Sequence, residues 1–308
     1  MATKGPSIET EVDGRRLSLS NLDKVLYPET GFTKGEVIDY YARIAPVMLP
    51  HLEGRCITFR RYPNGVDAKD FFEKRCPSHR PEWVPVARGP GDRNGKVDYC
   101  RLEEPASLVW AANLAALELH VPMARAADLD TPTMVVFDLD PGAPAAMREC
   151  CEVALHVRDT LAGLDLECLP KTSGSKGLQL YLPLNPRTDA EKTTHEHASS
   201  FALAVAQVLE KHLPSLVLTV MKRDLRTGKI FVDWSQNSHH KTTIGVYSLR
   251  ARPHPTVSTP VTWDEVEAAS DGAPLSFEAH EVLDRVAAHG DLFAPTLTLT
   301  QTLPAPAG

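Results

Sequence analysis

The stretch at residues 134–142, MVVFDLDPG, places the tightest constraint on how this chain can fold. Its apolar start predicts a buried strand. Side chains alternate along a strand, so Asp138 and Asp140 share one face while Phe137 and Leu139 point into the core. Two carboxylates this close repel each other in a half-buried place, and a divalent cation removes that cost better than protonation. The stretch indicates a metal-binding strand end, although Asp before Pro-Gly is also common turn chemistry.

Capped helical segments and short β-rich runs alternate irregularly around this strand. The mixture predicts an α+β (mixed α/β) fold with helices on mainly antiparallel sheets, rather than a doubly wound parallel sheet. Capping boxes predict helices that begin near 33–36, 188–191 and 262–265, periodicity predicts one over 145–163, and a buried helix is expected over 105–119. Strands are expected at 56–60, 97–102, 134–140, 166–170, 178–184, 216–220, 229–234 and 242–250.

The cysteines and the apolar content limit the environment in which the chain works. Six cysteines lack any C-x-x-C pair and Cys150 adjoins Cys151, which favours reduced thiols over a disulfide framework. A zinc site beginning at Cys76 and His79 is less favoured, because no second ligand pair stands at zinc spacing. No apolar run could cross a membrane and the first residues lack a signal-peptide stretch, which predicts a cytosolic protein without membrane contact.

The formal net charge of −7 hides an uneven distribution. Residues 55–101 carry 11 Lys/Arg against 6 Asp/Glu and residues 221–252 carry 7 against 2, whereas residues 261–308 carry 8 acids and one base. Two basic segments therefore remain available for nucleic acid, although a solvated surface is the alternative. The charged segment 89–96 is expected to be a flexible loop.

A third carboxylate and a Gly/Ser/Lys loop extend the pattern. Asp233 ends another β-rich run, IFVD, and three carboxylates on neighbouring strands are typical of enzymes that transfer phosphoryl groups with two metal ions. Nucleotide-sugar glycosyltransferases also end strands on D-x-D. In the loop TSGSKG the amides, the serines and Lys176 could cradle phosphates. It is not a Walker A loop, since a strand follows it, and a plain hairpin turn is the alternative.

Taken together, FDLDPG, KTSGSKGL and VDWSQN, with LELH and YSLRARPHP, resemble the polymerase domain of bacterial DNA ligase D. That family belongs to the archaeo-eukaryotic primase superfamily and works in non-homologous end joining. The resemblance implies a primase-like polymerase domain over residues 1–292. Its part up to about residue 105 would contribute DNA-end contacts, about 106–255 would form the catalytic core, and 293–308 would be a flexible tail or linker.

The resemblance also assigns roles to residues. Asp138, Asp140 and Asp233 would be catalytic and would bind two divalent ions, Mn²⁺ or Mg²⁺. The residues implied around the nucleotide are His120, Ser173, Lys176, Gln236, Lys241 and Arg250. One position departs from the pattern, because many relatives have His where this chain has Gln179.

The same comparison gives the N-terminal part a purpose. Asn21, Lys24 and Lys34 match the family's pocket for a 5′-phosphate on the downstream strand of a DNA gap. Phe71 and Phe72 match aromatics that stack on bases near the primer-template junction, and Arg60 and Arg61 are expected to contact DNA as well. Aromatic faces between basic residues suit junction DNA, although a buried aromatic pair is the alternative.

The resemblance implies a template-dependent nucleotidyltransferase that fills gaps and extends ends, with a family preference for ribonucleotides. Its expected partners are gapped or broken DNA with a 5′-phosphate, NTP or dNTP, Ku protein and a DNA ligase, in the bacterial cytoplasm at the nucleoid. A two-metal nuclease or other phosphotransferase would use the same carboxylates. A non-catalytic module that bridges DNA ends is a third possibility, but such a module gains nothing from three clustered carboxylates.

Overall fold

The computed structural model describes residues 7–91 and 95–305, and the chain divides into two compact units. Unit 1 contains the chain up to Val121 together with two later segments, Ile244–Val257 and Phe277–Asp291. Unit 2 contains Pro122–Thr243, Ser258–Ser276 and the chain from Leu292 onward. Unit 1 extends to Val121 because strand β9, Ala116–Val121, pairs within its sheet.

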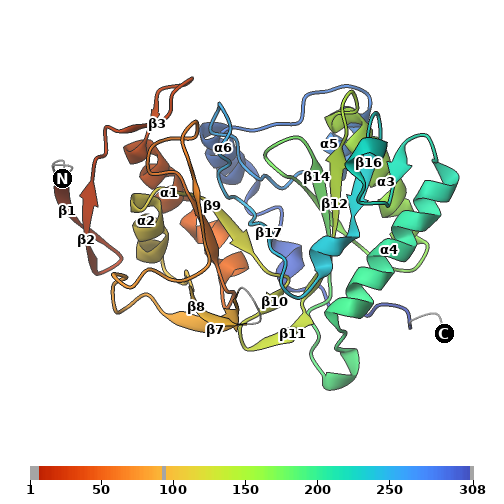
Figure 1. Cartoon of the computed structure of the whole chain (residues 1–308), viewed down its shortest axis with the longest axis horizontal. Helices are drawn as coiled ribbons and strands as arrows, with labels where there is room; N and C mark the ends of the chain where they lie inside the picture. The colour runs from red at the N-terminus through yellow and green to blue at the C-terminus, as the bar shows by residue number, and fades with distance from the viewer. Residues whose placement is uncertain (1–6, 92–94, 306–308) are drawn as a thin grey trace. The chain divides into compact units, whose positions relative to one another are not determined.

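Unit 2 is built on a five-stranded sheet of order β13-β14-β12-β16-β15, in which only the β15–β16 pair is parallel. Helices α3 and α4 lie together beside this sheet in Figure 1. The strands of unit 2 are β10 Ala124–Arg125, β11 Asp128–Pro132, β12 Met134–Pro141, β13 Leu169–Thr172, β14 Leu178–Pro183, β15 Val217–Leu218 and β16 Ile230–Asp233. Its helices are α3 Met147–Ala162, α4 His195–His212 and α5 Trp263–Ser270, with short 3₁₀ turns η2 Asp189–Glu191, η3 Arg223–Leu225, η4 Trp234–Asn237 and η5 Ala294–Leu297.

The helices that the sequence predicts in unit 2 are confirmed, but one of them begins at a later residue than predicted. Helix α3 ends before Gly163, and α5 begins with the capping box of Thr262 and Glu265. The helix expected to begin at 188–191 begins later, because Thr188 precedes only a 3₁₀ turn and Thr194 caps α4 by accepting a hydrogen bond from the amide of His197. Two capping residues six positions apart made the true start ambiguous in the sequence.

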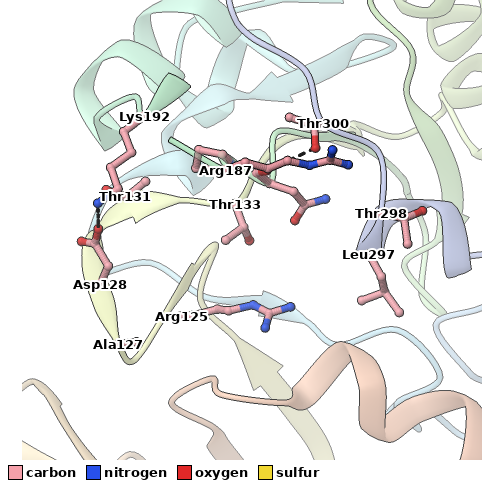
Figure 2. A pocket seen from close by; sticks show the side chains of 12 residues that line it. Arg125, Ala127, Asp128, Thr131, Thr133, Arg187, Lys192, Leu297, Thr298 and Thr300 are labelled. Atoms are coloured by element: carbon pink, nitrogen blue, oxygen red, sulfur yellow. Dashed lines mark hydrogen bonds and ion pairs between the residues drawn. The ribbon is translucent and has the colours of Figure 1, made fainter. Parts of the chain in front are cut away.

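The segment after residue 292, expected to be a flexible tail, instead packs against unit 2 through residue 305. Phe293 is buried and meets the ring of Tyr181 edge-on, with ring centroids 5.4 Å apart. Asn185 donates hydrogen bonds from its side-chain amide to the carbonyls of Thr296 and Leu299 at 2.9 and 2.8 Å. This segment also lines a cavity of about 610 Å³ (Figure 2). No local sequence pattern indicates this packing, because the large apolar residues there are few: Phe293, Leu297, Leu299 and Leu303. Residues 306–308 lie outside the described chain.

Unit 1 is built on a four-stranded sheet of order β17-β9-β5-β6, with three helices and three two-stranded ribbons. Its strands are β1 Ser7–Val12, β2 Arg15–Ser20, β3 Val25–Tyr27, β4 Phe32–Thr33, β5 Thr58–Arg61, β6 Phe71–Glu73, β7 Val86–Pro90, β8 Lys96–Cys100, β9 Ala116–Val121 and β17 Thr243–Ile244. Its helices are α1 Lys34–Leu52, α2 Pro105–Asn113 and α6 Ala279–His289.

Helix α1 begins as the sequence predicts, with a capping box between Thr33 and Glu36. Helix α2 is shorter than expected. It ends at Asn113, Ala115 has a positive φ of 56°, and the rest of the apolar run forms strand β9. A continuous apolar run does not distinguish a buried helix from a buried strand, so the expected extension to residue 119 was wrong.

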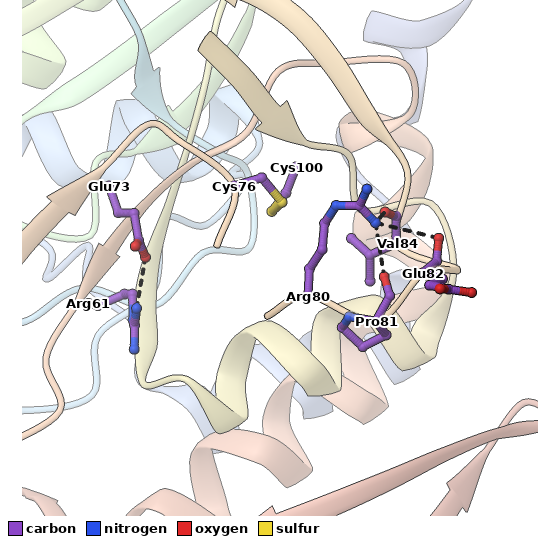
Figure 3. The surroundings of a disulfide bond; sticks show 8 residues. All are labelled: Arg61, Glu73, Cys76, Arg80, Pro81, Glu82, Val84 and Cys100. Carbon is purple, nitrogen blue, oxygen red and sulfur yellow. Dashed lines mark hydrogen bonds and ion pairs between the residues drawn. A yellow bond between two sulfur atoms is a disulfide. The ribbon is translucent and has the colours of Figure 1, made fainter. Parts of the chain in front are cut away.

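A disulfide joins Cys76 and Cys100, which corrects the expectation of reduced thiols (Figure 3). The less favoured alternative of a zinc site at Cys76 is excluded by the same bond. The Cys76 amide donates a 2.7 Å hydrogen bond to the carbonyl of Asp98, so the backbone of β8 passes close to Cys76. The other four cysteines, Cys56, Cys150, Cys151 and Cys168, are free and buried. The pairing depends on this tertiary approach and has no signature in cysteine spacing. Part of the loop expected at 89–96, residues 92–94, lies outside the described chain.

The predicted fold class is confirmed, since both units combine helices with mainly antiparallel sheets. In the described ranges, none of the helices has the length and apolar content needed to span a bilayer.

Candidate functional site

Strand β12 carries two of the three predicted aspartates and lies in the middle of its sheet. Asp138 stands directly opposite Asp233 of β16 and, on its other side, opposite Gln179 of β14. Residues opposite each other on neighbouring strands point to the same face, and Asp140 shares that face two positions along. The sheet therefore places the three aspartates on one face, as the sequence pattern predicts for the first two.

Two of the aspartates, Asp138 and Asp233, have defined hydrogen-bond partners. The side-chain amide of Gln179 donates to Oδ1 of Asp138 at 3.0 Å. Oδ1 of Asp233 accepts hydrogen bonds from the backbone amide and the hydroxyl of Ser235, at 3.1 and 2.6 Å. Oδ2 accepts one from the side-chain amide of Gln236 at 3.0 Å. Gln236, expected near the nucleotide, thus contacts a predicted metal ligand directly. Lys241 lies a short distance on, where its amide donates to the carbonyl of Ser238.

The three aspartates bring negative charges close together. Burial, and then the negative charges of Asp140 and Asp233, raise the pKa of Asp138 to about 7, despite the hydrogen bond from Gln179 and the charge of Lys171. In the ranges 7–91 and 95–305, however, no three Asp, Glu, His or Cys side chains form a ready-made metal cage. The donor types and the neighbouring negative charges nevertheless fit a divalent cation.

The Gly/Ser/Lys loop connects β13 to β14 and approaches β12 closely. Ser173 is buried, and its hydroxyl accepts hydrogen bonds from the amides of Ser175 and Gly177 at 3.3 and 3.2 Å. Lys176 is exposed. The serine therefore holds the shape of the loop, while the lysine is accessible to a ligand.

Gly177 allows this approach, and its replacement gives a first testable expectation. A Cβ at this position would lie 2.2 Å from the carbonyl oxygen of Leu139, between the two aspartates of β12. Gly177→Ala should therefore displace the loop or β12 and lower the free energy of unfolding by about 1–3 kcal/mol, the usual cost of overpacking. Urea unfolding measures the change. Gly163→Ala is the control for a Gly-to-Ala change in unit 2, because Gly163 has a negative φ of −64° and a Cβ there would meet its nearest atoms at 3.5 and 3.6 Å, an ordinary contact distance. Equal stability of Gly177→Ala and the parent would contradict the tight approach.

The other two residues predicted to contact the nucleotide, His120 and Arg250, lie in unit 1 around a buried acid. Glu118 of β9 is 1% exposed and accepts from His120 at 2.9 Å and from Nε of Arg250 at 3.1 Å. The amide of Ala251 and Arg60 add further contacts, at 3.1 and 3.5 Å. Burial opposes ionisation, but the His120 hydrogen bond and the Arg250 charge hold the pKa of Glu118 well below its usual range. Glu118 therefore fixes the orientation of His120 and Arg250.

The three residues expected to bind a 5′-phosphate come together at the start of α1. The backbone amide of Lys34 donates to the carbonyl of Lys24, and the backbone amide of Lys24 donates to the carbonyl of Asn21. Asn21 has a positive φ of 56°. Lys34 is 5% exposed, with its ammonium 2.6 Å from the carbonyl of Ser20. Burial, followed by the charges of Lys24 and Arg61, lowers the pKa of Lys34 to about 8. A cluster of cations that already repel one another favours an anionic ligand.

The predicted aromatic pair is on the surface. Phe71 and Phe72 of β6 are 52% and 54% exposed, so the alternative of a buried pair is excluded. Arg60 and Arg61 face them in register on β5. Arg60 pairs with Asp70 at 2.6 Å and Arg61 with Glu73 at 2.8 Å, so both guanidinium groups already have partners.

The cavity of unit 2 is separate from the aspartates. Figure 2 shows Thr133, which precedes β12, beside Arg125 and Arg187, whereas Asp138 and Asp140 lie towards the other end of that strand. No residue predicted to be functional lines it. The cavity and the sheet face that carries the three aspartates are therefore different places in unit 2.

Sequence reasoning missed two residues and left a third open. Glu118 lies inside LELH, and a carboxylate within a buried apolar run was a signal that could have been used. Lys171 precedes the Gly/Ser/Lys loop and is 1% exposed, which no local pattern indicates. Gln179, left undefined as a departure from the family, contacts Asp138.

Comparisons with known proteins show the family of the chain. The family model described as LigD, primase-polymerase domain, matches residues 33–293. The chain is 50% identical over 283 residues to the multifunctional non-homologous end joining protein LigD of Mycolicibacterium smegmatis, covering 91% of this chain and 36% of that protein. It is 30% identical over 275 residues to the bifunctional LigD of Bacillus subtilis, covering 89% of this chain and 43% of that protein.

A solved structure extends the likeness to three dimensions. The polymerase domain of Mycobacterium tuberculosis ligase D, solved in complex with DNA, superimposes with a TM-score of 0.85 at 44% identity, covering 93% of this chain and 99% of that one. The chain spans little more than a third of the length of the mycobacterial relatives. From the family match, the sequence identity and the shared fold, the chain belongs to the LigD primase-polymerase domain family.

Proposed function

We propose that this chain is a template-dependent nucleotidyltransferase that adds nucleotides to a DNA 3′ end in gaps and at broken ends. The observation that carries the proposal is the common face of Asp138, Asp140 and Asp233, placed by register on adjacent strands. Family membership supports the polymerase assignment, and the DNA in the Mycobacterium tuberculosis structure supports DNA as the substrate.

Asp138, Asp140 and Asp233 would hold two divalent ions, Mn²⁺ or Mg²⁺, which when bound lower the pKa of the attacking hydroxyl and offset charge on the triphosphate. Lys176, exposed on the loop of unit 2, would bind the phosphates of the incoming nucleotide, with Ser173 holding the loop. Gln236 and Ser235 would keep Asp233 oriented. His120 and Arg250, fixed by Glu118 in unit 1, would contribute further nucleotide contacts.

The names of the relatives suggest the cellular setting. Because they are non-homologous end joining proteins, we propose that this chain acts in double-strand break repair at the nucleoid. Ku protein and a DNA ligase would then be partners, ribonucleotides would be favoured, and Lys24, Lys34 and Asn21 would bind the 5′-phosphate of the downstream strand. Phe71 and Phe72 would stack on bases of the junction.

Insertion opposite a single templating base tests the function. A duplex with a one-nucleotide gap is incubated with Mn²⁺ and each of the four ribonucleotides and deoxyribonucleotides, and the four possible template bases are compared. The added nucleotide should follow Watson–Crick pairing with the template. Addition that ignores the template base, or shortening of the primer, would contradict the proposal.

A further inference from the structure

Lys171 is a buried cation to which the proposed reaction assigns no role. It is 1% exposed, and an ammonium group out of water is costly unless it is well hydrogen-bonded. Its Nζ donates to Oε1 of Gln179 at 2.5 Å and to the hydroxyl of Ser258 at 2.7 Å, and lies 5.2 Å from the ring centre of Tyr181. A fold does not need a lysine in such a place for packing alone.

The position of Lys171 in the sheet connects it to the aspartates. It stands opposite Gln179 in the β13–β14 register, Gln179 stands opposite Asp138, and Asp138 stands opposite Asp233. The four residues therefore form a row across four strands on one face of the sheet. The row begins with the buried cation and ends with two proposed metal ligands.

The hydrogen bonds along the row have a fixed direction. Lysine only donates, so Lys171 requires an acceptor and selects the carbonyl oxygen of the Gln179 amide. The hydroxyl of Tyr181 also donates to that oxygen, at 3.3 Å. The NH₂ group of Gln179 must then face Asp138, where it donates to Oδ1 at 3.0 Å. A flipped amide would place an oxygen against the carboxylate and an NH₂ group against the ammonium.

We propose that Lys171 and Gln179 are positioning residues that orient Asp138 for divalent-cation binding. The inference rests on the proposed metal role of Asp138. Gln179 occupies Oδ1, which leaves Oδ2 for the cation. It also separates the ammonium from the carboxylate, so that Lys171 does not form an ion pair that would compete with the metal. Partners of metal ligands of this kind are worth about 10–100-fold in metal affinity.

A histidine at position 179 would suit the same arrangement. A neutral imidazole can accept a hydrogen bond from Lys171 at one nitrogen and donate to Asp138 from the other. An asparagine keeps the amide but is one methylene shorter, so it cannot span from Lys171 to Asp138. Gln179→His is therefore the restoring variant and Gln179→Asn the disruptive one that retains polarity.

The test measures Mn²⁺ affinity by electron paramagnetic resonance, without DNA or nucleotide, so that it does not depend on catalysis. Gln179→Asn and Lys171→Met should each weaken Mn²⁺ binding about tenfold, and the double variant should be no weaker than Gln179→Asn alone because the two residues act in series. Gln179→His should bind Mn²⁺ like the parent. Lys192→Met, which changes an exposed lysine of the same unit, is the control.

Thermal unfolding in EDTA confirms that each variant is folded, and Lys171→Met is expected to fold because replacing a buried ion by an apolar chain of similar size is often tolerated. Parental Mn²⁺ affinity in Gln179→Asn would overturn the proposal. Additive losses in the double variant would also overturn it, because they would mean that the residues act separately. Asp138→Asn tests the underlying metal role by itself: if it binds Mn²⁺ as the parent does, the proposed function's metal site is wrong, whatever the result at residue 179.

Discussion

Replacing Asp138 by alanine should lower the rate of primer extension by about a thousandfold, the largest effect expected of any single change. Loss of a metal ligand removes several kcal/mol of transition-state stabilisation, and each 1.36 kcal/mol corresponds to about a factor of ten in rate. Single-turnover extension of a gapped duplex in Mn²⁺ measures the loss. Affinity for DNA should be unchanged or slightly higher, because the change removes negative charge near the phosphates.

Asp138→Asn provides the matched test of folding. Burial, and then the negative charges of Asp140 and Asp233, raise the pKa of Asp138, so a neutral side chain of the same shape avoids a buried charge and relieves repulsion and should leave the protein at least as stable as the parent. Glu152→Gln is the control for loss of one negative charge, at an exposed position of α3 in the same unit. Extension by Asp138→Ala at about a tenth of the parental rate or more would contradict the assigned role of the aspartate.

The second large effect concerns recognition of the DNA end. A Lys24→Ala, Lys34→Ala double variant should lose about a hundredfold in affinity for a gapped duplex with a 5′-phosphate, because charge-assisted contacts are worth about 1.5–3 kcal/mol each. Both lysines stand at the start of α1, where the helix dipole also favours a phosphate. Affinity for the same duplex without the phosphate should change little. Fluorescence anisotropy with the two duplexes measures the difference.

The pKa of Lys34 gives this prediction a second readout. Its ordinary value of 10.5 is lowered to about 8, chiefly by burial, so Lys34 is charged at neutral pH and loses its proton as the pH rises through about 8. A terminal phosphate remains a dianion over that range. Discrimination in favour of the 5′-phosphate should therefore decline between roughly pH 7 and pH 9.5.

A Lys192→Ala, Lys211→Ala double variant removes the same charge from exposed positions of unit 2 and should discriminate like the parent. If Lys24→Ala, Lys34→Ala also discriminates like the parent, or if the parent shows no preference for the phosphate, the end-recognition role is wrong.

The sequence carried most information where local chemistry decides the structure. Capping boxes at Thr33 and Thr262 predicted two helix starts to the residue, because the cap is formed within four residues. The pairing of Asp138 with Asp140 on one face follows from strand geometry alone. Asp233 was identified because it ends another β-rich run, and the β12–β16 register places it opposite Asp138.

Contacts between residues far apart in the chain could not be predicted from local sequence patterns. The Cys76–Cys100 disulfide depends on a loop that returns to β8, and the packed segment after residue 292 depends on Asn185 and Tyr181, more than 100 positions earlier. No local pattern indicates that Ile244–Val257 and Phe277–Asp291 belong to unit 1. Lys171 could not be recognised, because its partners Gln179 and Ser258 are 8 and 87 residues away and only the sheet brings them together.

The most direct test of the central claim counts pyrophosphate against nucleotides added. The parent protein, a gapped duplex with a 5′-phosphate, Mn²⁺ and the nucleotide complementary to the template base are mixed, and primer length and pyrophosphate are measured on the same samples. We predict one pyrophosphate released for each nucleotide that lengthens the primer, with both signals lost together in Asp138→Ala. Shortened primers without pyrophosphate, or pyrophosphate released while the primer stays unextended, would contradict a polymerase built on these three aspartates.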